Sequence, residues 1–77
     1  MSDWLEAMRA HVEEQLGDQV AWVGSSAGYH GGWHGIAIRT SDGYRHAVAV
    51  AEGDMPEVVA WALQTAIDER RKHLAVC

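Results

Sequence analysis

The sequence of 77 residues predicts one α+β domain, residues 1–77, in which a helix, three antiparallel strands and a second helix follow one another (αβββα). Apolar residues recur at helical spacing near both ends of the chain, and apolar β-prone runs flank a Ser-Asp-Gly turn between them. The length allows a single modest core. Because two amphipathic helices need a surface to cover, we expect both on one face of the sheet.

The first helix is expected over about residues 3–16. Asp3 and Glu6 have the spacing of a capping box, and Gly17 is typical of the position just after a helix. Between them the apolar residues recur every three or four positions, which indicates one buried stripe. That stripe consists of Leu5, Met8, Val12 and Leu16.

The run Val20-Ala21-Trp22-Val23 predicts a short first strand. The segment that follows, from Gly24 to Gly35, is rich in glycine and serine, so we expect a long loop. A loop of this length in so small a domain is typical of a functional or a disordered segment.

Two further strands are expected over residues 34–40 and 44–51. A two-residue turn between them would split the large apolar side chains over both faces of the sheet. A three-residue loop with Gly43 in the left-handed conformation instead places Ile36 opposite Val48, and all the β-branched bulk then shares one face. We prefer this second register.

The last helix is expected to start at Asp54, which would cap it, and to reach about residue 73. Pro56 suits the first turn, and Glu57 completes a second capping box. The stripe predicted to be buried consists of Met55, Val58, Val59, Ala62, Leu63, Ala66 and Ile67.

Charge and composition narrow the function. A net charge of −5, with six basic residues against eleven acidic ones, argues against direct nucleic-acid binding. The single cysteine, Cys77, allows no intrachain disulfide and fits a reducing compartment. With neither a secretory signal nor a transmembrane run, we expect a cytoplasmic protein without a membrane role. Neither Cys77 nor the pair Ser25-Ser26 has the setting of a nucleophile, so no enzymatic activity is expected.

The histidines do not predict a metal site. His30 and His34 are four residues apart, a spacing that suits a metal only on a helix, and here glycines surround them. We therefore expect neither a metal nor a cofactor. A small-ligand or metal-binding domain that uses this loop together with His46 remains an alternative.

Two surfaces are candidates for binding. The face of the sheet away from the helices is expected to be small and apolar, which suits docking or a homodimer. Its expected residues are Gly35, Ala37, Arg39, Arg45, Ala47, Ala49 and Ala51, with Ala21 and Val23 joining from the first strand.

The second surface is the polar side of the last helix, where helical geometry places Trp61 among carboxylates. An exposed Trp in such a setting is typical of an interface anchor. Trp61, together with acidic residues of both helices and aromatic residues of the glycine-rich segment, forms the expected partner-binding set. That set is Trp61, Glu57, Asp68, Tyr29, Trp33, Glu13 and Glu14.

The order of elements is similar to that of double-stranded-RNA-binding domains. That family has a basic cluster at the start of its second helix, where this chain has Asp54 and Glu57. The resemblance therefore covers the layout and does not imply RNA binding.

In length, acidity and lack of catalytic groups, the chain also resembles small proteins of phages and mobile elements that block host defence, anti-CRISPR proteins included. The resemblance implies a non-enzymatic inhibitor that covers a basic working surface of a larger complex. The alternative is a homodimeric scaffold protein joined through the alanine-rich sheet face.

Overall fold

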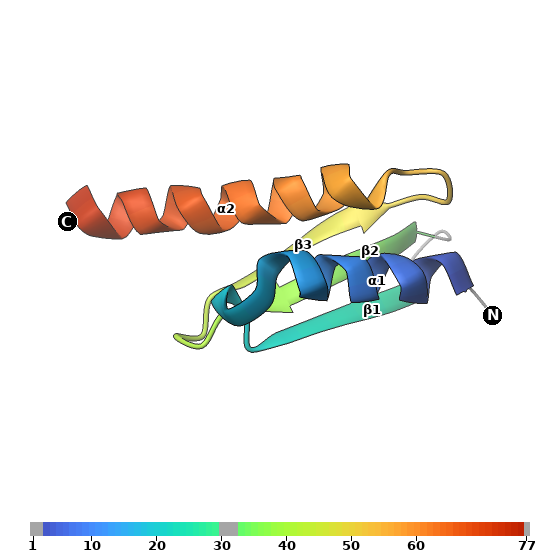
Figure 1. Ribbon diagram of the computed structural model, residues 1–77, viewed down its shortest axis with the longest axis horizontal. Coiled ribbons are helices and arrows are strands. Elements are labelled where there is room, and N and C mark those ends of the chain that lie inside the picture. The colour runs from blue at the N-terminus through green and yellow to red at the C-terminus, as the bar shows by residue number, and fades with distance from the viewer. Residues whose placement is uncertain (1–2, 30–32, 77) are drawn as a thin grey trace.

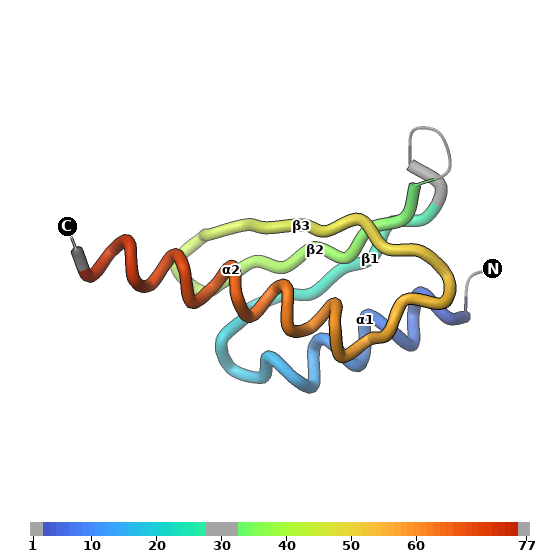
Figure 2. Tube along the Cα trace, turned by 90° about the horizontal axis from the view of Figure 1, so that it is seen from above, coloured from blue at the N-terminus to red at the C-terminus, as the bar shows by residue number. Residues whose placement is uncertain are grey.

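The elements follow one another in the predicted order in the computed structural model, which describes residues 3–29 and 33–76. They are α1 (Asp3–Leu16), a 3₁₀ turn η1 (Gly17–Gln19), β1 (Trp22–Tyr29), β2 (Trp33–Arg39), β3 (Arg45–Val50) and α2 (Pro56–Val76). The strands form one antiparallel sheet in the order β1-β2-β3. Figure 1 shows this arrangement, and Figure 2 shows that α1 and α2 lie on the same side of the sheet. The predicted αβββα fold is confirmed.

The hairpin between β2 and β3 has the preferred register. Ile36 pairs with Val48, and the backbone N–H of Thr40 donates to the carbonyl of Tyr44 (2.9 Å) to close a three-residue loop. Gly43 in that loop has a φ of +94°, a conformation that residues with a Cβ rarely adopt. The β-branched side chains were therefore a reliable guide to which residues face the helices.

The first strand is longer than the sequence predicted. β1 continues through Gly24, Ser25 and Ser26 to Tyr29, where a long loop was expected. It pairs with β2 over this stretch, with a register shift between Ser26 and Tyr29. Glycine and serine have low strand propensity, but pairing with the central strand supplies hydrogen bonds that the local sequence does not reveal. The expectation of a loop from Gly24 to Gly35 was wrong for most of its length.

The core lies between the helices and one face of the sheet. Val12, Ile36 and Leu63 are fully buried and come from α1, β2 and α2, so each layer contributes to the same cluster. The stripe predicted for α1 is buried as expected. The whole cluster is Leu5, Met8, Val12, Leu16, Val23, Ile36, Ile38, Val50, Val59, Ala60, Leu63 and Ile67.

The buried stripe of α2 is narrower than predicted. Met55 and Val58, both expected inside, are 61% and 56% exposed. The helix begins at Pro56, and the Asp54 carboxylate accepts a hydrogen bond from the backbone N–H of Ala51 (2.8 Å), so Asp54 holds the turn before the helix instead of capping it. A sheet of three strands is too narrow to cover the whole apolar side of α2, which leaves its first turn overhanging β3.

A polar contact ties α2 to the β2–β3 loop. The Arg70 guanidinium donates to Asp42 Oδ1 (2.9 Å) and lies over the Tyr44 ring, 4.6 Å from its centroid. Asp42 also accepts a hydrogen bond from the hydroxyl of Thr40. The second half of α2 is thereby fixed to the end of the sheet. Within residues 3–29 and 33–76, no helix is both long and apolar enough to cross a bilayer.

Candidate functional site

The structure exposes Trp61, the predicted anchor, on the helical side. Its side chain is 68% exposed, the largest value among the large apolar residues that the structure describes. It lines a shallow hollow of 240 Å³ where the end of α1 meets α2. The remaining residues of the hollow are Gln15, Leu16, Glu57, Ala60 and Gln64. Trp61 and Glu57, which were both predicted to bind a partner, therefore line the same hollow.

A pair of amides fixes Gln64, which lines this hollow. Gln19 and Gln64 exchange two side-chain hydrogen bonds of 2.7 Å each, which join η1 to α2 across the chain. Gln64 donates a further bond to the carboxylate of Asp68 (3.0 Å). Asp68, another predicted binding residue, is thus oriented by the same network one turn after Gln64. Because hydrogen-bonded side chains lose less freedom on binding, this network favours a preformed surface.

The acidic residues Glu6, Glu13 and Glu14 of α1 are exposed, but they do not line the hollow. Glu13 accepts a hydrogen bond from Arg9 (3.2 Å), and Glu14 precedes Gln15 on the exposed side of the helix. Arg9 also donates to Glu6 (2.8 Å), and this hydrogen bond, helped by the guanidinium charge, lowers the pKa of Glu6. The Glu6 carboxylate therefore stays ionised at neutral pH.

The open face of the sheet differs from its prediction. Val23 is buried among the core residues, so the residues of β1 that face outward are Trp22, Gly24 and Ser26. The expectation that Ala21 and Val23 would join this face was wrong, because the short run from Val20 to Val23 has no polar alternation to set its register. The outward residues of the other two strands are Trp33, Gly35, Ala37, Arg39, Arg45, Ala47 and Ala49. All but Trp33 were predicted on this face, whereas Ala51, also predicted there, follows the end of β3.

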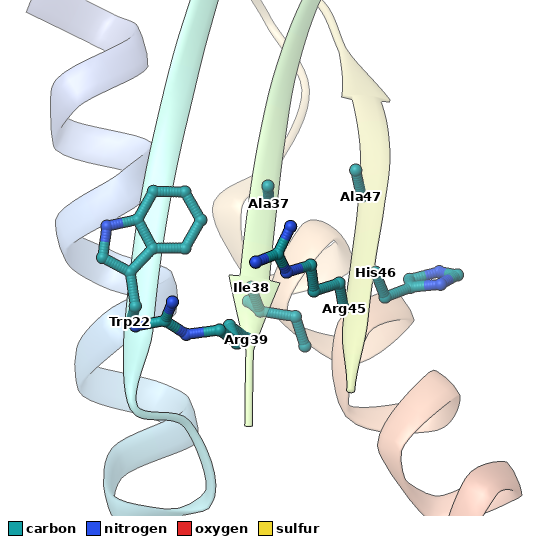
Figure 3. A pocket seen from close by; sticks show the side chains of 7 residues that line it. All are labelled: Trp22, Ala37, Ile38, Arg39, Arg45, His46 and Ala47. Carbon is teal, nitrogen blue, oxygen red and sulfur yellow. The ribbon is translucent and has the colours of Figure 1, made fainter. Parts of the chain in front are cut away.

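Trp22 and two arginines surround a hollow of 610 Å³ on this face. Trp22 on β1 pairs with Arg39 on β2, which pairs in turn with Arg45 on β3, so the three side chains form one row across the sheet (Figure 3). All eleven Asp and Glu residues lie outside the three strands. Within the described residues, neither arginine forms an ion pair. The open face is therefore cationic, whereas the chain as a whole is acidic.

The Trp22 indole packs on the backbone of its own strand. A Cβ atom placed on Gly24 would lie 2.1 Å from the indole Cζ2, well inside van der Waals contact. Only glycine leaves room for the ring there, and the indole remains 49% exposed. The sequence contained this signal as a Trp two residues before a Gly on the same face of a strand, but it could be recognised only once β1 was known to continue past Val23.

The aromatic residues of the glycine-rich segment do not lie with Trp61. Trp33 is 65% exposed and lines a hollow on the open face of the sheet with Gly35 and Ala47. The backbone of Tyr29 pairs with Trp33, while the Tyr29 side chain lies outside the part that the structure describes. The predicted binding set is thus divided between two sides of the molecule.

The described histidines do not converge on a metal site. The His34 ring meets the Trp4 ring edge to face, with 5.2 Å between centroids. His34 pairs with Val50 and His46 with Ile38, so the two histidines are separated by about 13 Å along the sheet at the usual rise per strand residue. His30 lies outside the described residues. Among residues 3–29 and 33–76, no group of three or more His, Cys, Asp or Glu side chains is placed to hold a metal ion.

Comparison of the chain with protein-family models, with curated proteins and with solved structures found no match.

Proposed function

We propose that this protein is a non-enzymatic interaction module that inhibits a larger complex by covering a basic working surface of it. The observation that carries the proposal is the indole of Trp61, 68% exposed beside Glu57 over a shallow hollow. Isolated exposed apolar residues are common, but a Trp above a preformed hollow and framed by carboxylates has the features of an interface anchor.

The charge distribution supports the same proposal. Glu57 lines the hollow with Trp61, and Asp68 is hydrogen-bonded to Gln64 of the same hollow. Glu13 and Glu14 add exposed carboxylates on α1. Carboxylates around an apolar anchor complement a partner surface rich in Lys and Arg, and they speed the encounter more than they tighten the complex. A surface that normally holds nucleic acid is rich in Lys and Arg in this way. The setting that we favour is an anti-defence protein of a phage or mobile element, such as an anti-CRISPR.

A photo-crosslinking amino acid at position 61 tests the proposal in the native host. We expect a discrete covalent adduct whose partner peptides are rich in Lys and Arg, and we expect Trp61→Ala to abolish co-purification of that partner while the circular dichroism spectrum stays unchanged. The same photo-crosslinker at position 45, on the open face of the sheet, is the matched control. Adducts with a different protein from position 45, and none from position 61, would show that the helical side is not the binding surface.

Salt dependence provides a second measurement on the purified pair. Raising the ionic strength should slow association markedly and change dissociation little, because exposed charges act mainly on the encounter. An association rate that is insensitive to salt would remove the acidic residues from the proposal.

A further inference from the structure

The outer edge of β3 carries unpaired backbone groups. Thr40 and Tyr44 form a hydrogen-bonded position of the hairpin, and such positions alternate along an antiparallel pair. The N–H and C=O groups of the even-numbered residues of β3 therefore face β2, and those of Arg45, Ala47 and Ala49 face away from the sheet. Within the described residues, no backbone hydrogen bond pairs these outward groups.

The edge of β3 lacks the features that usually prevent pairing with another chain. Edge strands are typically blunted by proline, by several charges or by a bulge. The opposite edge, β1, has a register shift between Ser26 and Tyr29. β3 is regular over Arg45–Val50, without proline, and has one charged residue, Arg45.

An apolar hollow runs beside this edge. Met55, just before α2, and Val58, in its first turn, were both predicted to be buried but are exposed beside β3, where they border a hollow of 420 Å³. The other residues that line it are Val48, Ala49, Gly53, Asp54, Val59 and Ala62. The edge thus joins backbone groups available for strand pairing to apolar surface that a neighbouring element would cover.

We propose that a second copy of this chain occupies the edge, with the two β3 strands paired antiparallel about a two-fold axis at Ala47. This register sets Arg45 of each copy opposite Ala49 of the other, so no like charges meet in the pairing. It also directs Arg45 toward the 51–54 turn of the other copy, which carries Glu52 and Asp54. A parallel arrangement would place Arg45 against itself. Charge complementarity therefore favours the antiparallel pair.

The same axis brings the two helical layers together. Residues paired in an antiparallel sheet keep the same face, so both α2 helices lie on one side of the joined sheet, and the exposed Met55 and Val58 of each copy approach the α2 helix of the other. A chain of 77 residues has a small core, and a second subunit is a usual supplement at this size. A dimer formed by stacking the two open faces would instead bring Arg39 and Arg45 of one copy close to the same residues of the other, and their like charges would repel.

Oxidative cross-linking distinguishes the edge from the open face. At a hydrogen-bonded position on the two-fold axis, the two Cα atoms of residue 47 are about 5.5 Å apart, within the range of a disulfide. We expect Ala47→Cys in a Cys77→Ser background to form a covalent dimer on mild oxidation. The matched control is Ala37→Cys, which projects from the same face but on the central strand, about 14 Å from its counterpart in the edge-paired dimer. Cross-linking of the control as fast as Ala47→Cys would overturn the proposal.

Sedimentation equilibrium tests the contact in the unmodified chain. We expect the wild-type protein to reach dimer mass at high micromolar concentration, and Val58→Asp to raise the dimer dissociation constant by at least about tenfold. Ala47→Pro, which removes an outward N–H, should act in the same direction, while Trp61→Ala should leave the constant unchanged. Circular dichroism confirms that each variant is folded. A wild-type chain that remains monomeric throughout would overturn the proposal, and so would folded Val58→Asp and Ala47→Pro variants that dimerise normally.

Discussion

The helical side and the open side of the sheet differ both in charge and in how each exposes a tryptophan. All carboxylates lie outside the strands, and the open face carries Arg39 and Arg45. Trp61 stands on the exposed side of α2, whereas Trp22 lies flat across the backbone of Gly24. The two indoles therefore have different relations to the fold: Trp61 borders an open hollow, whereas Trp22 occupies space that a side chain at position 24 would fill.

The largest expected effect separates the buried side of α2 from its exposed side. Leu63 is fully buried and Trp61, two residues earlier, is 68% exposed. We expect Leu63→Ala to lower the free energy of unfolding by about 2–5 kcal/mol, because it leaves a cavity in the shared core. Trp61→Ala should change it by no more than about 0.5 kcal/mol, as for other surface substitutions. Urea unfolding followed by circular dichroism measures both. A loss of several kcal/mol for Trp61→Ala would place the indole in the core and remove it as a binding anchor.

A smaller effect tests the role assigned to Trp22. Gly24→Ala puts a methyl group where the indole lies, so we expect the ring to move away and the free energy of unfolding to fall by about 1–2 kcal/mol. The indole N–H resonance of Trp22 should shift strongly in the NMR spectrum. Gly35→Ala is the matched control on the same face, since its nearest neighbour would be the Val48 carbonyl oxygen at 3.4 Å. Equal shifts of the Trp22 resonance in both variants would contradict the stacking of Trp22 on Gly24.

Local patterns predicted the parts of this fold that depend on neighbours in sequence. The ends of α1 follow from Asp3, Glu6 and Gly17, and the hairpin register follows from keeping Ile36 and Val48 on one face. The extension of β1 through Gly24 was missed because it depends on hydrogen bonding to β2, which outweighs the low strand propensity of glycine and serine.

The candidate site was predicted less completely, for a related reason. Helical spacing correctly placed Trp61 outside, because one face of an amphipathic helix must be polar. The same spacing could not tell that Met55 and Val58 extend beyond the edge of the sheet, since periodicity gives the direction of a side chain and not the width of the surface that it meets. Nor could it place Trp22 on the cationic face before the register of β1 was known.

The smallest expected effect concerns the contact that fixes the end of α2 to the hairpin loop. The hydrogen bond from the Thr40 hydroxyl, followed by that from Arg70, lowers the pKa of Asp42 below its ordinary value of 3.8. The folded state then binds fewer protons than the unfolded state as the pH falls through this range. The contact therefore stabilises the fold fully above that ordinary value, and its contribution is lost as the pH falls through the lowered pKa.

Thermal unfolding midpoints measured between neutral pH and strong acid test this contact. We expect Asp42→Asn to have a lower midpoint than the wild type at neutral pH, and the two midpoints to converge in acid. Some acid dependence should remain in the variant, because the pKa of Glu6 is also lowered, by its hydrogen bond with Arg9. The difference should be small, since Asp42 is exposed and solvent screens its interaction with Arg70. Parallel profiles for the two proteins, with no convergence in acid, would mean that the Asp42 carboxylate does not hold the helix to the loop in solution.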